Sequence, residues 1–490
     1  MKSVCIVGAG TMGAGIAQWF ATNGIKTFLT DNNQRVVEAA KQSISNSYQR
    51  LVKKNKFTQN QVDQSQANLN YLLAIEDIPK DIDLVIEAIV ERLEIKKELF
   101  KNLDSHFCPQ TIFASNTSGL SIEKIFHDLP NRLSCGLHFF NPAPVMKLVE
   151  IIKSKTISDE KLMNLHSFFL SRDKVPVIVK DQAGFICNRV ARNFYGESFR
   201  ILNDDDPYQM NLIDQTLKHV GGFKMGPFEL MDLIGVDINL NATKGVYESF
   251  GHHPRFAPHS YQVKSVESGR LGRKTNNQGL ILGRLDESVS FFNIFVPLKA
   301  EDNHPPQIID YDELSHDYPE DSIVFDKTRF NLEEKKQLIT ILKERNNKII
   351  SEGSHLTKQF TELSKKLSFD VCATNFYSKT NTIEYIQNLD EDAICQAFSN
   401  HQDRNVFVRK NHLSLGLIFP RVLIQIIHEA NIAFDEDLAS KKDIDLAMKY
   451  GLNYPHGPFE WEELIGKEIY ELLRVNLMNS ISKKPNRYSR

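Results

Sequence analysis

A glycine pattern at the amino terminus constrains the fold of this chain more than any other feature. A short apolar run from Val4 to Val7 leads into G-x-G-x-x-G, and the stretch A-G-I-A-Q-W-F-A that follows has helical periodicity. The first glycine permits a tight turn, the second lets the backbone approach a pyrophosphate, and the third lets the helix pack close to the strand. We therefore predict a Rossmann-type α/β domain whose dinucleotide-binding turn consists of Gly8, Gly10, Thr11, Met12 and Gly13.

An acidic residue ends the second predicted strand. The segment K-T-F-L-T runs into Asp31, 18 residues beyond Gly13. A carboxylate at this point accepts hydrogen bonds from the adenosine ribose hydroxyls, and its charge disfavours a 2′-phosphate. The pattern therefore favours NAD over NADP.

Two further buried strands are predicted, D-L-V-I-E-A-I-V from Asp83 and T-I-F-A from Thr111. Glu91 and Lys96 follow the first strand, and the cluster S-N-T-S at residues 115–118 follows the second. Ligands of an open α/β sheet bind at the carboxyl ends of its strands, so these polar groups are candidates for a binding site. The alternative is that the hydroxyls only cap a helix that starts near Ser121.

The stretch L-H-F-F-N-P-A-P-V-M-K-L-V-E, from Leu137 to Glu150, contains a candidate general base. An imidazole in general titrates near neutrality, and Glu150 lies twelve positions beyond His138. A carboxylate that binds one imidazole nitrogen fixes the tautomer and makes the other nitrogen a better proton acceptor. Taken alone, the stretch does not establish this role, because a lone histidine beside aromatic residues is more often a packed side chain than a catalyst.

A polar helix is predicted from Gln34 to about Lys56, ending in the basic run K-K-N-K at residues 53–56. Such a run is usually a solvated face. The chain has 490 residues, which predicts two to four domains. Its net charge of −3, with acids and bases interspersed, argues against a nucleic-acid surface or a polybasic membrane anchor.

No apolar run approaches the roughly 18 residues that a membrane-spanning helix needs. The six cysteines are scattered and include no C-x-x-C pair, which argues against a disulfide framework and a zinc site. We therefore expect no metal, and a protein of the reducing cytoplasm.

The carboxyl-terminal part contains an internal duplication. The segment from Ile213 to Gly235 aligns without a gap with the segment from Ile444 to Gly466, at an offset of 231 residues, and both contain G-P-F-E. Both segments have helical periodicity. The sequence therefore predicts two copies of an all-α domain.

Five motifs in a fixed order give the first 285 or so residues a resemblance to a known family. They are G-A-G-T-M-G, I-E-A-I-V-E, F-A-S-N-T-S, the stretch around His138, and D-Q-A-G-F-I-C-N-R. Together they resemble the NAD-dependent 3-hydroxyacyl-CoA dehydrogenase family, which includes the 3-hydroxybutyryl-CoA dehydrogenases. The resemblance implies an enzyme that uses NAD to oxidise 3-hydroxyacyl-CoA esters reversibly.

The resemblance also implies roles for individual residues. His138 matches the catalytic base and Glu150 its carboxylate partner, while Ser118 and Asn188 match residues that hold the substrate oxygens near the base. Positions associated with NAD are Asp31, Glu91, Lys96, Ser118 and Lys153. Positions associated with the coenzyme A substrate are Ser47 and Lys54, which would give the basic run a phosphate to bind.

The second helical copy lacks one of these residues. Extending the alignment with a one-residue adjustment sets G-L-I-F-P-R-V at residues 416–422 against G-F-I-C-N-R-V at 184–190, which places Pro420 opposite Asn188. We therefore predict one active site per chain. We also predict an intramolecular pseudo-dimer, in which residues 186–285 pack on about 405–485, in a chain that is a monomer or a homodimer.

The predicted order of domains is an α/β Rossmann-type domain at 1–185, a helical domain at 186–285, a small α/β segment at 290–404 and a second helical copy at 405–490. The small segment contains strand-like S-I-V-F-D, S-F-D-V-C-A-T-N-F and R-N-V-F-V-R and a helical E-E-K-K-Q-L-I-T-I-L-K-E. It resembles a degenerate nucleotide-binding unit, but it has no G-x-G-x-x-G, so we assign it no cofactor.

Three alternatives stay open at this point. One is a 3-hydroxyadipyl-CoA-type dehydrogenase of aromatic degradation, since the acyl chain is not readable from the sequence. Another is a hydroxyacid dehydrogenase that does not use coenzyme A, against which Ser47 and Lys54 argue. The third is an NAD-binding or structural protein without activity, against which the intact His138 and Glu150 argue.

Overall fold

The computed structural model describes residues 1–284, 294–297, 308–310, 323–326, 332–344, 347–353, 358–373, 382–387, 405–410 and 417–482. The chain forms two compact units. Met1–Arg189 and Ile432–Leu452 make up the first, and Val190–Asn431 and Asn453–Arg490 make up the second. The predicted domain limits at residues 285, 290 and 404 lie outside the described residues and stay predictions.

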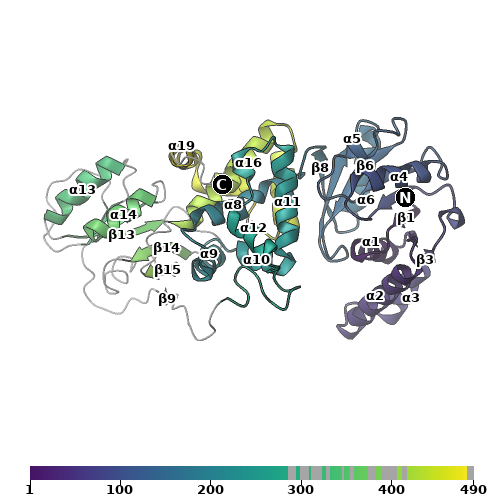
Figure 1. Ribbon diagram of the computed structural model, residues 1–490, viewed down its shortest axis with the longest axis horizontal. Coiled ribbons are helices and arrows are strands. Elements are labelled where there is room, and N and C mark those ends of the chain that lie inside the picture. The colour runs from purple at the N-terminus through teal and green to yellow at the C-terminus, as the bar shows by residue number, and fades with distance from the viewer. Residues whose placement is uncertain are drawn as a thin grey trace. The chain divides into compact units, whose positions relative to one another are not determined.

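An eight-stranded sheet forms the centre of the first unit, in the order β3-β2-β1-β4-β5-β6-β7-β8 (Figure 1). All neighbouring strands are parallel except the antiparallel pair β6 and β7. This is the doubly wound order of a Rossmann domain, so the predicted fold is confirmed. The strands are β1 (Ser3–Val7), β2 (Lys26–Thr30), β3 (Leu69–Leu72), β4 (Leu84–Glu87), β5 (Ile112–Ser115), β6 (Ser134–Phe139), β7 (Leu148–Lys153) and β8 (Val175–Lys180).

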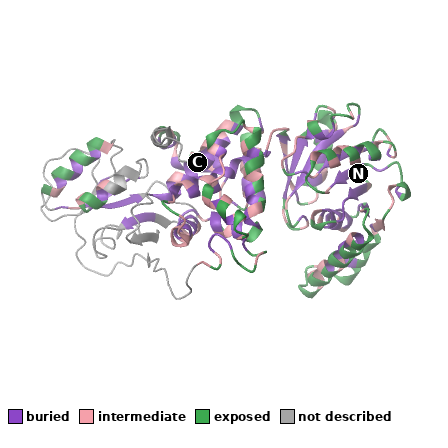
Figure 2. Ribbon diagram, in the orientation of Figure 1, coloured by how far each residue is buried: buried purple, intermediate pink, exposed green. Residues whose placement is uncertain are grey.

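Helices cover this sheet and bury their apolar faces on it. The strands β4 and β6 are buried at every position, as expected for central strands covered on both faces (Figure 2). By contrast, α2 buries a single stripe at Val37, Ala40, Ile44 and Tyr48 and leaves its other residues partly or fully exposed, as predicted for a polar helix. The helices of this unit are α1 (Thr11–Thr22), α2 (Gln34–Lys53), α3 (Gln59–Ala67), α4 (Leu93–Asp104), α5 (Ile122–Ile125), α6 (Asp159–Leu170) and α17 (Lys441–Gly451), with a short 3₁₀ turn η1 (Ile75–Asp77) and α7 (Cys187–Val190) at its end.

The predicted helical duplication is visible in the element bounds. At the offset of 231 residues, α10 (Pro227–Ile234) corresponds to α18 (Pro458–Ile465) from first to last residue. Each begins with proline in its first turn and ends at a glycine with positive φ, Gly235 or Gly466, because these sites need a residue without a Cβ. The other helices of the two helical copies are α8 (Arg192–Ile201), α9 (Pro207–His219), α11 (Val236–Ser249), α12 (Ser260–Glu267), α16 (Ile418–Asp435) and α19 (Lys467–Ser482), with the 3₁₀ turn η2 (Pro254–Phe256), in addition to α17 of the first unit.

Charged and aromatic contacts join the two helical copies within the second unit. Glu197, which is fully buried, binds Arg200 of its own copy at 2.7 Å and Arg421 of the other at 2.5 Å. Burial alone would raise the pKa of Glu197, but the two guanidinium groups lower it, so the carboxylate stays ionised. A second pair joins Arg255 to Glu429 at 2.9 Å. These ion pairs link the two helical copies within the second unit, and the predicted pseudo-dimer stays a prediction.

The middle part of the chain forms a seven-stranded sheet in the order β10-β11-β12-β13-β14-β15-β9. Its β13, β14 and β15 are joined by one antiparallel and one parallel pairing, as are β6, β7 and β8 of the first sheet. The described elements are β9 (Ile294–Pro297), β10 (Ile308–Asp310), β11 (Ile323–Asp326), α13 (Leu332–Glu344), β12 (Lys348–Glu352), α14 (Lys358–Leu367), β13 (Asp370–Ala373), β14 (Thr382–Gln387) and β15 (Asn405–Lys410).

A buried ion pair supports the interpretation of this sheet as a degenerate copy of the first. In the first sheet, Lys96 on α4 binds Glu87 at the end of β4 at 2.6 Å, and Ser115 at the end of β5 donates to the same carboxylate. In the second, Lys335 binds Asp326 at 2.6 Å and Ser351 donates to that carboxylate, and the sequence separation of nine between acid and lysine is the same. The middle sheet therefore resembles the part of the first sheet from β4 to β8, and its origin as a degenerate copy stays a prediction.

Within the parts of the chain that the structure describes, no helix is both long enough and apolar enough to cross a membrane.

Candidate active site

The glycine turn has the geometry that its sequence predicts. Gly8 has φ of 103°, and a Cβ on it would lie 2.6 Å from the Ala88 carbonyl oxygen. A Cβ on Gly13 would overlap the carbonyl oxygen of Gly8, whereas a Cβ on Gly10 would meet nothing within 4 Å. The first and third glycines are thus required by the protein itself, and the space over Gly10 fits a pyrophosphate at the start of α1.

Asp31 is tied to this turn. Its Oδ2 accepts a hydrogen bond of 2.9 Å from the backbone N–H of Ala9, and its Oδ1 accepts one of 3.0 Å from Asn33. The carboxylate is partly exposed. It is therefore held next to the glycine turn, where a ribose would lie.

Glu91 joins the ends of β4 and β5. It accepts hydrogen bonds from the Thr117 hydroxyl at 2.6 Å and the Ser118 backbone N–H at 2.9 Å, and it lies 3.1 Å from Lys96 Nζ. Burial raises the pKa of Glu91, but Lys96 and these donors outweigh it, so the net shift is downward and the carboxylate stays charged. The structure thus brings Glu91, Lys96 and Ser118 together.

The candidate dyad is formed by direct pairing across β6 and β7. His138 and Glu150 lie opposite each other in the antiparallel register, and His138 Nδ1 is 2.6 Å from Glu150 Oε2. Both residues are buried, with 7% of the surface of His138 and 0% of that of Glu150 exposed. With Nδ1 donating to the carboxylate, Nε2 is left as the proton acceptor. The proximity of the two side chains follows from the strand pairing, which also explains their spacing of twelve.

The other carboxylate oxygen of Glu150 caps the start of a helix. Oε1 accepts the backbone N–H groups of Ile186 and Cys187, both at 3.0 Å, at the start of α7. Asn188, the next residue, donates its amide to the carbonyl oxygen of Ser118 at 3.0 Å. The four predicted catalytic residues are thereby connected through one network.

Comparison with known proteins decides which family has this arrangement. The family model described as 3-hydroxyacyl-CoA dehydrogenase, NAD binding domain matches residues 3–182, and the model for the C-terminal domain of the same family matches 184–280 and again 416–489. The chain belongs to the 3-hydroxyacyl-CoA dehydrogenase family. The two matches to the C-terminal model also agree with the duplication of the helical domain.

Individual relatives agree with this assignment. The chain is 33% identical over 485 residues to the 3-hydroxyadipyl-CoA dehydrogenase of Escherichia coli, covering 98% of this chain and 94% of that one. It is 37% identical to the mitochondrial hydroxyacyl-coenzyme A dehydrogenase of Sus scrofa, over 56% of this chain and 89% of that one. The crystal structure of an Escherichia coli 3-hydroxybutyryl-CoA dehydrogenase superposes with a TM-score of 0.77 at 30% identity, covering 99% of this chain and 95% of that one.

The family assignment makes this an NAD-dependent dehydrogenase of 3-hydroxyacyl-CoA esters. Asn116 is a residue of this dehydrogenase that the sequence did not single out. Its side-chain oxygen accepts the backbone N–H of Phe139 at 2.8 Å and so fixes the strand beside His138. Asn116 belongs to the S-N-T-S cluster, which the sequence marked as a candidate binding site. The sequence alone did not separate the role of Asn116 from the roles of its neighbours.

Lys174 belongs to none of the sequence motifs, but it holds the loop that follows His138 in place. Its Nζ donates to the carbonyl oxygens of Ala143 and Met146, at 2.6 and 2.5 Å, and lies 5.2 Å from the centre of the Trp19 ring. Burial lowers the pKa of Lys174 to about 8. This lysine therefore ties the N-P-A-P-V-M loop of the dehydrogenase to its interior.

Three predicted residues are not brought into the network. Lys153 lies opposite Cys135 in β6, three register positions from the dyad, and its Nζ binds Asp159 at 2.5 Å. Ser47 accepts a hydrogen bond of 3.0 Å from Gln18, which ties it to α1, and Lys54 lies exposed after the end of α2. Their predicted roles with NAD and coenzyme A stay predictions.

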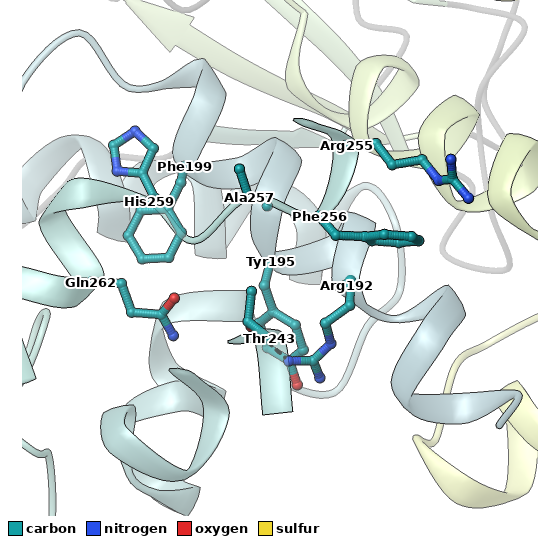
Figure 3. A pocket seen from close by; sticks show the side chains of 10 residues that line it. Arg192, Tyr195, Phe199, Thr243, Arg255, Phe256, Ala257, His259 and Gln262 are labelled. Carbon is teal, nitrogen blue, oxygen red and sulfur yellow. Dashed lines mark hydrogen bonds between the residues drawn. The ribbon is translucent and has the colours of Figure 1, made fainter. Parts of the chain in front are cut away.

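Two hollows elsewhere in the dehydrogenase do not fit its substrate. One, of about 420 Å³, lies at the amino ends of β1, β4 and β5 beside Asp83 and Ile112, at the sheet edge opposite the dyad. The other lies in the second unit and is lined by side chains that include Arg192, Tyr195 and His259 (Figure 3). Its volume of about 10 Å³ holds a single water at most. No cluster in the described part of the chain has three or more His, Cys, Asp or Glu side chains placed to hold a metal.

Proposed function

We propose that this chain converts (S)-3-hydroxyacyl-CoA to 3-ketoacyl-CoA reversibly, in fatty acid β-oxidation or related acyl-CoA metabolism, with His138 as the base. The observation that carries the proposal is the contact of 2.6 Å between His138 and Glu150. This pair lies at the edge of the sheet where the parallel strands have their carboxyl ends, and the glycine turn lies at the same edge. That edge is where an open α/β sheet binds its ligands. A base and a dinucleotide site therefore share one edge.

The chain's own residues supply position, a proton acceptor and charge. His138 Nε2 takes the proton of the C3 hydroxyl while Glu150 stabilises the imidazolium that forms, and the same pair returns the proton when a 3-ketoacyl thioester is reduced. Ser118 and Asn188, joined by a hydrogen bond of 3.0 Å, hold the substrate oxygens near the base. NAD, when bound, accepts the hydride that leaves C3.

The nucleotide is held by the turn and the acidic residues around it. The first turn of α1 and Gly8 to Gly13 bind the pyrophosphate, and Asp31 binds the ribose hydroxyls. Glu91 and Ser118 lie just beyond the ends of β4 and β5, at the same sheet edge as the glycine turn, and would contact the same nucleotide. Lys96 is 1% exposed and bound to Glu87 and Glu91, so we propose that it acts on NAD by fixing Glu91. Lys153 completes the proposed set.

The acyl group defines a second candidate within this function. The relative that matches along nearly the whole chain is named a 3-hydroxyadipyl-CoA dehydrogenase. We propose short acyl chains such as 3-hydroxybutyryl as the default and a dicarboxylic 3-hydroxyacyl-CoA as the alternative. Ser47 and the exposed Lys54 are proposed to bind the coenzyme A phosphates. The scattered cysteines support a location in the cytoplasm.

The contacts between the helical copies support a chain that works as a monomer or as a homodimer, because ion pairs and aromatic rings join the two copies within one chain. Separating the copies by a cut near residue 290 tests this. An amino-terminal piece that self-associates or precipitates supports it, and a soluble monomeric piece with full activity contradicts it.

Formation of NADH with a panel of substrates tests the function. The panel contains 3-hydroxyacyl-CoA esters of increasing length, 3-hydroxyadipyl-CoA and the corresponding free acids. His138→Gln should lower kcat at least about a hundredfold, which is the usual loss when a general base is removed. The matched control is His127→Gln, an exposed histidine on the same domain whose change should leave kcat unaltered.

Each outcome separates two hypotheses. Turnover of the esters but not of the free acids supports coenzyme A recognition, and equal turnover of both points to a hydroxyacid dehydrogenase. A His138→Gln variant that keeps more than about one percent of the rate shows that the base has been wrongly assigned.

A further inference from the structure

A helix of the second helical copy packs on the strand that carries Glu150. α17 lies in the same compact unit as the Rossmann sheet and contacts β7 and β8. Its inner residues Ile444, Ala447 and Met448 are fully buried. The segment before it is bonded to the end of β8, since Lys180 donates its N–H to the Leu438 carbonyl oxygen at 2.9 Å. The second copy is therefore part of the core around the dyad.

Cys187 is the residue through which α17 reaches the dyad. Its Sγ donates to the carbonyl oxygen of Ala447 on α17 at 3.3 Å. Its backbone N–H donates to Glu150 Oε1 at 3.0 Å, and Glu150 Oε2 in turn binds His138. Burial raises the pKa of the Cys187 thiol well above its ordinary value, so the thiol keeps the proton that it donates. Asn188 follows directly in the chain.

Gly451, the last residue of α17, lies beside this contact and leaves no room for a side chain of its own. A Cβ on Gly451 would lie 2.5 Å from Leu148 Cδ2 and 2.8 Å from Cys187 Sγ, and 3.5 Å from the ring of Phe140. A side chain fits there only if the side chains of Leu148 and Cys187 shift. At the matching position of the first copy, 231 residues earlier, the chain has Val220, which is fully buried. The two copies therefore differ at the point where the second copy meets Cys187 and β7.

We propose that α17 is a positioning element for the catalytic dyad, and that Gly451 and Cys187 are its positioning residues. α17 holds Cys187, and Cys187 holds Oε1 of Glu150 and places Asn188. The second helical copy, which lacks catalytic residues of its own, thus serves the active site of the first half of the same chain. This inference rests on the proposed function only for its activity readout.

Gly451→Ala and Gly451→Val in the full-length chain test the proposal. Each adds atoms where Leu148 and Cys187 lie, and displacement of a catalytic group by about 1 Å costs up to roughly a hundredfold in rate. We expect kcat with 3-hydroxybutyryl-CoA to fall at least about tenfold with alanine and further with valine. The KM for NAD should change less than about twofold, because the glycine turn joins β1 to α1, whereas α17 packs on β7 and β8. The control is Gly245→Ala on α11, where a Cβ meets nothing within 4 Å.

Hydrogen exchange measured by mass spectrometry gives a readout that does not depend on turnover. The amides of Ile186 and Cys187 are bound to Glu150, so they should exchange faster in both variants, while the peptide that spans β1 and α1 should exchange as in the wild type. Leu148→Val removes the nearest clashing atom. The double variant Gly451→Ala with Leu148→Val should therefore recover at least half of the lost kcat and the slow exchange.

The outcomes are distinct. Loss of kcat with accelerated exchange at residues 186–187 and rescue by the double variant supports the proposal. Unchanged kcat, or a loss of kcat without faster exchange at 186–187, overturns it, as does faster exchange throughout the first unit. A wild-type protein that does not oxidise the esters overturns the proposed function, while the exchange data still decide whether α17 holds Cys187.

Discussion

Glu384 accepts the backbone N–H of Ile418 through both of its carboxylate oxygens, at 2.8 and 3.1 Å. Glu150 accepts the N–H of Ile186 at 3.0 Å in the corresponding place, since Ile186 and Ile418 match in the alignment of the two copies. Both carboxylates are fully buried. However, Ala373 lies opposite Glu384 in the strand register, where His138 lies opposite Glu150. The second half has kept the carboxylate at the start of a helix, and it has alanine at the opposite strand position, where the first half has histidine.

This difference separates two roles of the same carboxylate. Capping a helix start uses hydrogen-bond acceptance, which does not require a charge, whereas orienting an imidazole and stabilising its cation does. Glu384 has the first role, and Glu150 has both. The duplicated chain therefore contains a natural control for the second role.

Glu150→Gln tests the separation. The glutamine oxygen still accepts the N–H groups of Ile186 and Cys187, so the thermal unfolding midpoint should change little. Its amide, however, donates to His138 Nδ1 and moves the imidazole proton to Nε2, so kcat should fall about a hundredfold or more. Steady-state kinetics and thermal unfolding are measured side by side.

Glu384→Gln is the matched control for that variant. It changes the same group at the same kind of helix start, and we expect kcat to stay within about twofold of the wild type. An equal loss of activity in the two variants would mean that the carboxylates act through the fold, and the orienting role of Glu150 would have to be abandoned.

Asp31→Asn should weaken the preference for NAD. The asparagine oxygen can still accept the Ala9 N–H, which Asp31 binds at 2.9 Å, so the glycine turn should keep its shape. The negative charge that repels a 2′-phosphate is lost. We expect the ratio of kcat/KM for NAD to that for NADP to fall at least about tenfold. An unchanged ratio would place the determinant of cofactor choice elsewhere.

Lys174→Met should change how stability depends on pH. The folded-state pKa of Lys174 is about 8, below its ordinary value of 10.5, because the side chain is buried. Between these values the unfolded chain binds a proton that the folded protein has released, so this lysine makes the free energy of unfolding rise with pH. The variant lacks this contribution. The difference in unfolding free energy, wild type minus Lys174→Met, should grow from pH 8 to pH 10 in urea titrations, and a constant difference contradicts it.

His259→Asn should make the second unit less sensitive to acid. Burial lowers the pKa of His259 to about 4, and its ring stacks on Phe199 with 5.0 Å between ring centres (Figure 3). Between pH 6.5 and 4 the unfolded chain binds a proton that the folded protein does not, so stability falls as the pH falls. Asparagine keeps an acceptor for the N–H of Tyr261 at the start of α12. The loss of urea stability between pH 7 and pH 5 should be smaller in the variant than in the wild type.

The sequence predicted those parts of the site that local patterns encode. The glycine turn and Asp31 follow from spacing within one βαβ unit, and the structure joins them at 2.9 Å. His138 and Glu150 lie on neighbouring strands joined by a short connection, so their pairing is nearly local. The contact between Cys187 and Ala447 spans 260 residues and leaves no periodic signal, which is why the role of α17 could not be read from the sequence. Lys174 is similar, because its partners are backbone carbonyls that have no sequence signature.

Lys96 and Lys335 allow stability and cofactor binding to be tested separately. Each is fully or almost fully buried and bound to a buried carboxylate, Glu87 or Asp326, at 2.6 Å. Replacing either lysine with methionine leaves that carboxylate without its cation, which should cost about 3–5 kcal/mol of stability in the sheet concerned.

Only Lys96 also binds Glu91, at 3.1 Å. We therefore expect Lys96→Met to raise the KM for NAD several-fold in addition to destabilising the first unit, because Glu91 loses the cation that holds it in place. Lys335→Met should destabilise the second unit and leave the KM for NAD unchanged when both are measured below the unfolding transition. A raised KM in both variants would show that the middle sheet takes part in cofactor binding, whereas an unchanged KM in both would remove Glu91 from the NAD site.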